Sequence, residues 1–494
     1  MTNKTGYVDS IPFIHKWAAA CKPYEIDINL QYHGLASRLA EPDIRVVDLG
    51  CGSGATLLLL AESMPNSEFV GLDFNPEHID WANEFARKSN LKNITFKQES
   101  FASTLQSTYG TFDLVICQGV YSWVSDAVRQ EALDCIDRLA ATEAALQISW
   151  NTEAGFAQVV PLRSILREMI NVEEREHEED WAKVFSLFQT LESMEVPWLR
   201  KNPVGRDRIE GWKTSNPRYL AHEYLNEAWH LTNFNDISRA LLQYGFEFGG
   251  YSFFERWRLN NPDIEFDDTH AGMEEQIAEL ALSVPHRNDT FVRGKPSTTP
   301  PVLETACFAC PQPADLVSVQ LIAHQSKKTT GILHQCLKGP KTVAELLQLS
   351  SDQEPAQVIA RIRDELSRGM IIRVDDEVVD IEGVDDDASP VDISTQMEFA
   401  TAFSKNLIDD TKLLTELSHF PSRITRGGIQ VPATIALLVD EFCKTDNEDQ
   451  WYLQSQQRIA ASGIALEEAE LRKTMQSCTK SWIPFLLFHQ VLQK

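Results

Sequence analysis

The segment DLGCGSGA contains three glycines at alternate positions, Gly50, Gly52 and Gly54. Residues without a Cβ atom let a turn form in which backbone N–H groups, and the start of a following helix, approach a ligand closely. Further along, the apolar run 68–72 ends at Asp73, a place where a carboxylate can accept hydrogen bonds from both hydroxyls of a ribose. The glycine loop and Asp73 together predict a nucleotide-binding site.

The surrounding pattern predicts the elements that position these residues. The apolar run 44–50 leads into the glycine loop, and the leucine-rich stretch TLLLLAESM follows it, which is the order strand, loop, helix. Strands are then predicted at 68–72, 94–98, 112–123 and 145–150, separated by helices at 76–89 and 126–141. Strands that alternate with helices indicate an α/β fold with a largely parallel sheet.

The glycine loop alone fits two classes, because GCGSGA matches both the GxGxG spacing of methyltransferases and the looser GxGxxA form of dinucleotide-binding loops. The strand FDLVICQGVYSW, introduced by Phe112 and Asp113, separates them. With this strand, the glycine loop and the acidic strand end, the series resembles class I methyltransferases that depend on S-adenosylmethionine (SAM). The resemblance implies a Rossmann-like seven-stranded sheet and SAM as the cofactor.

The resemblance also implies roles for individual residues. Asp73, followed by Phe74, would hold the ribose of SAM, and Asp48 would orient the loop or reach the amino group of SAM. The remaining cofactor contacts would come from the glycine loop under the methionine moiety, from the residues flanking the adenine, and from the wall facing the methyl group: Gly50, Cys51, Gly52 and Gly54; Glu99, Ser100 and Phe101; Gln118 and Gly119.

The acceptor side is less clearly marked. Tyr121 and Trp123 could form aromatic walls around an alkyl stem, or could be core aromatics that follow a buried strand. His222 and Glu223 could be a base and its partner, or could brace the helix that carries HEYLN. No metal site is predicted, because the pair Cys307 and Cys310 lacks a second pair of ligands.

The sheet needs two strands beyond the fifth, and nothing directly after Asn151 supplies them. We expect a helical insertion, then a helix at 235–244, a sixth strand at 246–255 and a seventh at 289–293. The predicted division is a first part of the SAM-binding core at 1–150, the insertion at 151–219, and the end of the core with a regulatory domain at 220–295.

Several short sequence segments point to a particular subgroup of these methyltransferases: GVYSWV, ISWNTEAGF, PLRSILREM, HEYLN and NDTFVRG. Together they resemble bacterial methyltransferases with a methyltransferase regulatory domain, among them rickettsial protein lysine methyltransferases. This resemblance implies methyl transfer to lysine side chains of a protein. The alternatives are a small-molecule N- or O-methyltransferase, and a non-catalytic SAM-binding regulatory or scaffold protein. The chain departs from the pattern at Gln118, where His is frequent, and at 153–156.

The C-terminal part follows a proline-rich linker at 296–313. Helical patterns at 329–337, 341–349 and 355–369 precede a strand at 370–374, an order that resembles a winged helix and predicts such a domain at 314–388. The segment that follows, DDEVVDIEGVDDD at 375–387, would repel phosphate. We therefore expect a protein-contact module rather than a DNA-binding one, and a helical domain at 389–494.

Charge and composition limit the partners. The 494 residues include 45 Lys plus Arg and 72 Asp plus Glu, for a net charge of -27. This excess disfavours binding to nucleic acids and to anionic lipid. Apolar stretches are too short to span a bilayer, and the nine scattered cysteines suit a reducing compartment. A cytoplasmic protein with a protein substrate is the prediction.

The insertion has an uneven charge. Residues 153–195 hold four basic and ten acidic side chains, whereas 199–218 hold six basic and two acidic ones. Segments of opposite sign could pair between two subunits, which predicts a homodimer through 151–219, or could simply be solvated helix faces.

Overall fold

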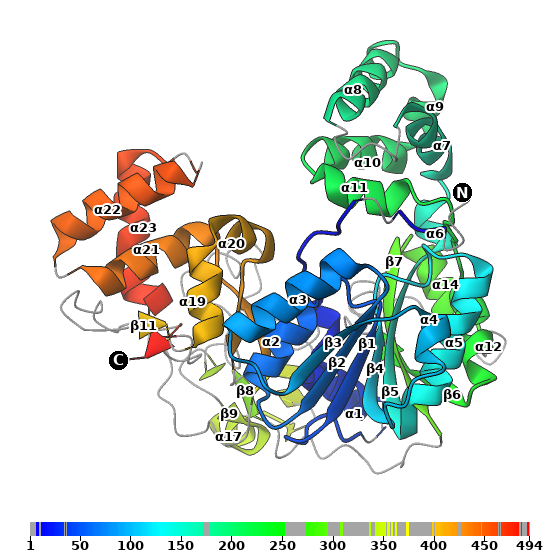
Figure 1. Ribbon diagram of the computed structural model, residues 1–494, viewed down its shortest axis with the longest axis horizontal. Helices are drawn as coiled ribbons and strands as arrows, with labels where there is room; N and C mark the ends of the chain where they lie inside the picture. The colour runs from blue at the N-terminus through cyan, green and yellow to red at the C-terminus, as the bar shows by residue number, and fades with distance from the viewer. Residues whose placement is uncertain are drawn as a thin grey trace.

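The computed structural model describes most of the first 294 residues and parts of the remainder (Figure 1). The described residues are 6–8, 11–33, 35, 37–170, 178–251, 272–294, 307–309, 335–336, 341–351, 353–355, 357–358, 361–362, 372–374, 398–399, 401–422, 426–445, 447–462, 464, 466–483, 486 and 492–493.

A seven-stranded sheet forms the centre of the molecule, as predicted. Its strands are β1 (Arg45–Leu49), β2 (Glu68–Asp73), β3 (Ile94–Gln98), β4 (Phe112–Cys117), β5 (Ala140–Asn151), β6 (Phe246–Tyr251) and β7 (His286–Arg293). Their order is β3-β2-β1-β4-β5-β7-β6, with β7 antiparallel to both of its neighbours and the pairs from β3 to β5 parallel. The reversal of strand order between β1 and β4 creates a crevice at the carboxyl ends of the strands, where open α/β sheets bind ligands.

Helices cover both faces of the sheet (Figure 1). One layer contains α1 (Pro23–Tyr32), α2 (Ala55–Ser63) and α3 (Pro76–Lys88), and the other contains α5 (Asp126–Leu139) and α12 (Phe234–Leu242). Successive side chains of β1 point to opposite faces of the sheet: Val46 packs with α2, whereas Val47 packs with α5. Both are fully buried, which explains why the central strands read as continuous apolar runs.

Three strand boundaries differ from the predictions. β4 ends at Cys117, so the residues from Gln118 onward leave the sheet as a turn. β5 and β7 are both longer than predicted: β5 begins at Ala140, opposite Phe112 of β4, and β5 and β7 pair in an antiparallel ladder that runs from Ala145 opposite Val292 to Asn151 opposite His286. The ladder brings the polar ends of these two strands together at the crevice.

The residues after β5 form a helical lobe above the sheet, as Figure 1 shows. Its helices are α6 (Glu153–Phe156), α7 (Val160–Met169), α8 (Glu178–Ser193), α9 (Pro197–Lys201), α10 (Pro203–Lys213) and α11 (Pro217–Tyr224). Their apolar residues form a separate core that also includes Val8 and Ile11. The start of the chain is thereby fixed to this lobe. The domain boundaries and the homodimer given above stay predictions.

A second helical lobe follows near the C-terminus, in agreement with the predicted helical region. It contains α19 (Ala402–Asp409), α20 (Thr411–Leu417), α21 (Ala433–Lys444), α22 (Glu448–Ala461) and α23 (Glu468–Ser477). Its core is continuous with that of α2 and α3: the Phe403 ring meets the Phe85 ring edge-on at 5.0 Å, and Asn406 Nδ2 donates to Ser89 Oγ at 3.2 Å. This lobe therefore packs directly on the sheet domain.

The predicted winged helix is described only in part. α17 (Val343–Leu349) follows β9 (Lys341–Thr342), and β10 (Ile372–Val374) lies beside β8 (Cys307–Ala309) in a three-stranded sheet of order β10-β8-β9. The first predicted helix and the acidic segment 375–387 lie largely or wholly outside the described residues, as does Cys310. A winged helix is thus not confirmed.

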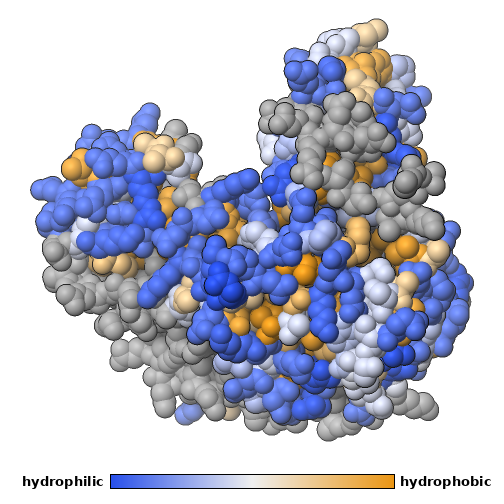
Figure 2. All heavy atoms as spheres, viewed as in Figure 1, coloured by the Kyte–Doolittle hydropathy of each residue, from blue (hydrophilic) through white to orange (hydrophobic). Residues whose placement is uncertain are grey.

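The surface seen in Figure 2 is mostly hydrophilic, with apolar residues visible on the insertion lobe and on the flank of the sheet domain. Among the described helices, none combines the length and the apolar character needed to cross a membrane.

Candidate active site

A cavity of about 1010 Å³ lies at the carboxyl ends of β1, β2 and β4. The sheet and the glycine loop form one side, α10 and α11 of the insertion lobe form the opposite side, and residues near the N-terminus line it between them. Ligand pockets typically measure about 300 to 1,000 Å³. This cavity therefore has room for a nucleoside cofactor together with the reacting end of a second molecule.

The glycine loop needs glycine for two different reasons. Gly50 and Gly52 have φ values of 78° and 56°, a left-handed conformation that other residues adopt at a cost. A Cβ atom on Gly50 would lie 2.5 Å from Val120 Cγ2, whereas a Cβ on Gly52 would meet no atom within 4 Å. Because Gly52 lines the cavity, the open space beside it is a surface on which a ligand can rest.

Asp73 holds the loop to the end of β2. Its Oδ2 accepts a hydrogen bond from the Gly52 amide at 2.9 Å, and its Oδ1 accepts one from the Asn75 amide at 2.8 Å. His78 Nδ1 lies 3.4 Å from Oδ1, and the Phe13 amide donates to Nε2 of the same ring at 3.0 Å. Asp73 thus links the cofactor loop to the N-terminal segment while its carboxylate faces the cavity.

Asp48 provides a fit test for SAM. Burial, and then the charge of Asp73, raise the pKa of its carboxyl to about 8. Its Oδ1 is buried and has no hydrogen-bond partner among the described residues, a situation that costs free energy unless a ligand compensates. Since Asp48 lines the cavity beneath the loop, the ammonium group of the methionine moiety would supply that partner. The residues present therefore fit SAM.

The residues predicted to flank the adenine also line the cavity: Phe74, Glu99, Ser100 and Phe101. Glu99 is already engaged, because Tyr109 Oη donates to it at 2.6 Å and the hydroxyls of Ser107 and Thr104 at 3.2 Å. Ser100 caps the short helix α4 (Phe101–Thr104). These bonds fix the shape of this end of the cavity.

Cys51, Gln118 and Gly119 line the cavity at its centre. Gln118 Nε2 donates to Asn288 Oδ1 at 2.5 Å, while its Oε1 is buried without a partner among the described residues. The Gly119 amide donates to Ser149 Oγ at 2.8 Å. The turn after β4 therefore carries one side-chain acceptor that has no partner among the described residues.

Two predicted site residues do not line the cavity. Gly54 caps α2 with φ 70°, and a Cβ there would lie 2.3 Å from the Phe96 ring, so it is needed for packing. Tyr121 is buried in the core between the sheet and α5, with the Arg129 guanidinium 4.3 Å from its ring centroid. The turn after Cys117 directs Tyr121 into that core, so of the two predicted alternatives its ring takes the core position and not the acceptor wall.

Trp123 and His222 do line the cavity, but both are engaged in bracing it. Trp123 Nε1 donates to the Glu223 carbonyl oxygen at 3.4 Å. His222 Nε2 donates to the Ile11 carbonyl oxygen at 2.7 Å, and the rings of Tyr7 and Phe13 pack against it at 5.3 and 5.2 Å. His222 thus anchors the N-terminal segment rather than presenting a free base.

This bracing has a pH dependence. Burial lowers the pKa of His222 to about 4, from an ordinary value of 6.5. The unfolded chain therefore binds more protons than the folded one between these values, so this side chain's contribution to stability is full above pH 6.5 and is lost as the pH falls toward 4. We expect the free energy of unfolding of a His222→Gln variant, whose amide can still donate to Ile11, to fall less steeply over that range. Urea unfolding at several pH values measures this, and parallel curves would contradict it.

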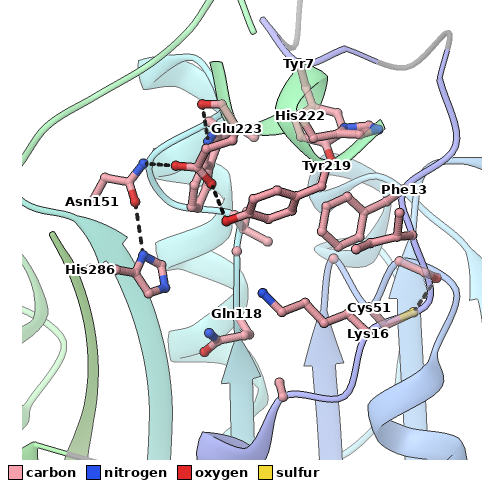
Figure 3. Close-up of a pocket in the computed structure, with 18 of the residues that line it drawn as sticks. Tyr7, Phe13, Lys16, Cys51, Gln118, Asn151, Tyr219, His222, Glu223 and His286 are labelled. Atoms are coloured by element: carbon pink, nitrogen blue, oxygen red, sulfur yellow. Dashed lines mark hydrogen bonds between the residues drawn. The ribbon is translucent and has the colours of Figure 1, made fainter. Parts of the chain in front are cut away.

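A chain of polar side chains lies across the cavity from the glycine loop (Figure 3). Glu223 accepts a hydrogen bond from Asn151 Nδ2 at 3.0 Å and one from Tyr219 Oη at 3.5 Å. Because the Asn151 amide donates to Glu223, its Oδ1 accepts from His286 Nδ1 at 3.0 Å. Burial raises the pKa of Glu223 and lowers that of His286 to about 4. Burial therefore favours the neutral form of both side chains.

The sequence did not indicate most of this side of the cavity. Tyr7, Phe13, Lys16 and Trp17 line it from the N-terminal segment, which carries no motif. His286 lies before the predicted start of the seventh strand, so its pairing opposite Asn151 was missed. The polar residues at the expected ends of the fifth and seventh strands could have indicated that these two ends meet at the site.

Comparisons with known proteins agree with this geometry. Residues 40–178 match the model of a methyltransferase domain family. The chain is 26% identical over 309 residues to the uncharacterized protein sll1526 of Synechocystis, covering 61% of this chain and 60% of that protein. It is 28% identical over 233 residues to the protein RP028 of Rickettsia prowazekii, covering 46% of this chain and 89% of the relative.

Among solved structures, PKMT2 from Rickettsia typhi in complex with AdoHcy (S-adenosylhomocysteine) superposes with a TM-score of 0.67 at 16% identity, over 97% of this chain and 100% of that one. At this identity the likeness concerns the fold. The strand order, the glycine loop and the family match agree on one conclusion: residues 40–178 match a methyltransferase domain, and the sheet has the class I methyltransferase fold.

Proposed function

We propose that this protein transfers methyl groups from SAM to amines, and that its acceptors are lysine side chains of a protein. The observation that carries the proposal is Glu223, a half-buried carboxylate with a raised pKa that lies across the cavity from the cofactor loop. An amine acceptor must lose a proton to become a nucleophile, and a carboxylate within the site can accept that proton.

The cofactor would be held by Asp73 at the ribose, Asp48 at the ammonium, and the backbone of Gly50 to Gly52. When bound, SAM supplies an electrophilic methyl group on a positively charged sulfur. The task of the chain is then to hold an acceptor in line with that group in a site from which water is excluded.

The acceptor side suits a lysine. The Tyr219 ring offers a face to which an ammonium is attracted, and its hydroxyl is bonded to Glu223. Glu223 removes the proton, and the unused Gln118 Oε1 accepts a hydrogen bond from the amine. Phe13 and Trp123 supply apolar walls for the alkyl stem.

A protein substrate is supported by two further observations. Several segments of the chain resemble those of rickettsial protein lysine methyltransferases, and the net charge of -27 attracts basic protein surfaces. The cavity lies between the sheet domain and the insertion lobe, so both can contact a large partner. The match to the Synechocystis relative covers 60% of that protein's length. The proposal about the substrate is therefore made for this chain and not for that relative.

A labelling experiment tests the proposal. Purified protein is incubated with SAM carrying a radiolabelled methyl group and a bacterial lysate, and labelled proteins are digested and analysed by mass spectrometry. We expect methylated lysines that are absent when excess AdoHcy is added. Label found only in small molecules would favour the small-molecule alternative, whereas tight AdoHcy binding without labelled product would favour a scaffold protein.

A further inference from the structure

One lysine of this chain already occupies the acceptor side of the cavity. Lys16 extends from the N-terminal segment, and Figure 3 shows its amine directed toward the space between Gln118, Tyr219 and His286. Its Nζ lies 5.2 Å from the centroid of the Tyr219 ring. Among the residues that the structure describes, no hydrogen bond or ion pair is formed by this ammonium. Lys16 therefore presents a primary amine where an acceptor amine is expected.

The position of Lys16 is fixed by the main chain on both sides of it. The Phe13 amide donates to His78 Nε2 at 3.0 Å, and the Ala18 amide donates to Thr56 Oγ1 at 3.1 Å. Between them, His15 Nδ1 lies 2.9 Å from Ser53 Oγ in the glycine loop. The segment is thus attached to the same loop and helix that form the cofactor side, so the Lys16 side chain starts from a defined place.

The amine and the proposed base influence each other. The positive charge of Lys16 opposes the effect of burial on the pKa of Glu223, and it contributes to lowering the pKa of His286. Tyr219 connects them further, since its ring faces the amine and its hydroxyl bonds to Glu223. A proton acceptor therefore lies close to this amine.

We propose that Lys16 is itself a methyl acceptor, and that each chain methylates its own Lys16. In the step, the Lys16 ammonium gives one proton to the Glu223 carboxylate, and the freed lone pair of Nζ forms a bond to the methyl carbon of SAM as the bond from that carbon to sulfur breaks. The products are methylated Lys16 and AdoHcy, and Glu223 releases the proton to solvent. This inference rests on the proposed function, whose acceptor it names within the chain.

Mass spectrometry of the full-length protein tests the inference. The purified chain is incubated with SAM bearing a deuterated methyl group, alone and with lysate, and the peptide containing Lys16 is analysed. We expect deuterated methyl on Lys16 in the wild type and its complete loss in Lys16→Arg. Lys22→Arg is the matched control, because Lys22 lies on the same segment but pairs with Glu25, and it is expected to retain the label on Lys16.

The outcomes separate the two proposals. Labelled lysate proteins with an unlabelled Lys16 would overturn the inference and leave the proposed function standing. No label on any protein would overturn both. Transfer within one chain predicts that the cofactor-binding variant Asp73→Ala acquires no more label in a mixture with Lys16→Arg than it acquires alone at the same SAM concentration; additional label in the mixture would show transfer between chains and overturn the self-methylation mechanism.

A measurement without catalysis tests the placement of the amine. Acetic anhydride modifies accessible lysines, and the extent at each site can be read by mass spectrometry. Because the amine and the cofactor share one cavity, AdoHcy is expected to reduce modification of Lys16 severalfold while leaving the exposed Lys92 unchanged. Equal modification of Lys16 with and without AdoHcy would contradict the shared cavity.

Discussion

The Glu223→Gln variant is expected to lower kcat for methyl transfer by about 10²- to 10⁴-fold, the usual range for loss of a positioned base. The amide keeps the size of the carboxylate, and its oxygen can still accept the hydrogen bond from Asn151, while its NH2 can donate to the Tyr219 hydroxyl oxygen. It cannot take a proton from an ammonium. Single-turnover kinetics with a saturating lysine acceptor measure the effect, and the Kd for SAM, from calorimetry, is expected to stay within about twofold because Glu223 lies across the cavity from the loop.

The pH profile adds a second readout. Burial raises the pKa of Glu223, so the wild-type rate should rise with pH as the carboxylate loses its proton, and this rise should be absent in Glu223→Gln. Glu227→Gln is the matched control, since Glu227 is exposed, lies beyond the end of α11 and does not line the cavity. A Glu223→Gln enzyme with wild-type kcat would show that deprotonation occurs before binding or through another group.

The Asp73→Ala variant is expected to weaken SAM binding by about 1.5 to 3 kcal/mol, the scale of hydrogen bonds to a charged group, which corresponds to a roughly 10- to 150-fold rise in Kd. Asp73 acts twice: it faces the ribose position, and it holds the Gly52 amide at 2.9 Å. Calorimetry with SAM measures the Kd, and thermal unfolding of the free protein shows whether the fold is retained.

The matched control for Asp73 is Asp113→Ala. Asp113 also accepts a hydrogen bond from a backbone amide, that of Arg45 at 2.8 Å, but it lies at the opposite end of the sheet and does not line the cavity. Its loss should change stability without changing the Kd for SAM. An unchanged Kd in Asp73→Ala would remove Asp73 from the cofactor site.

The cofactor half of the site was predictable because its residues are local in sequence. A glycine loop between a strand and a helix, and an acid at the end of the next strand, are positioned by elements that adjoin them, so Gly50, Gly52 and Asp73 could be placed by pattern alone. The parallel order of the first five strands follows from their alternation with helices.

The acceptor half depends on distant contacts and was only partly predictable. For Tyr121 the sequence left an acceptor wall and a core position open, and the turn at Gly119, with φ 69°, directs it into the core. Glu223 and Asn151 meet only because the insertion lobe folds back over β5, 72 residues apart in sequence. The segment that carries Tyr7 and Lys16 is held at the cavity by hydrogen bonds from its backbone amides to distant side chains that no local pattern specifies.

The attachment of the N-terminal segment also involves the C-terminal lobe. The His15 amide donates to Glu416 Oε2 at 3.4 Å, and the same carboxylate pairs with Arg218 of α11 at 3.7 Å, which in turn donates to the Phe13 carbonyl oxygen at 3.0 Å. During synthesis on the ribosome, the segment that bears Lys16 emerges first, yet its final contact emerges about 400 residues later. The sheet can form early, but the closed cavity is a late product of translation, so a nascent chain truncated before α20 would be expected to bind cofactor in an open and more exchangeable site.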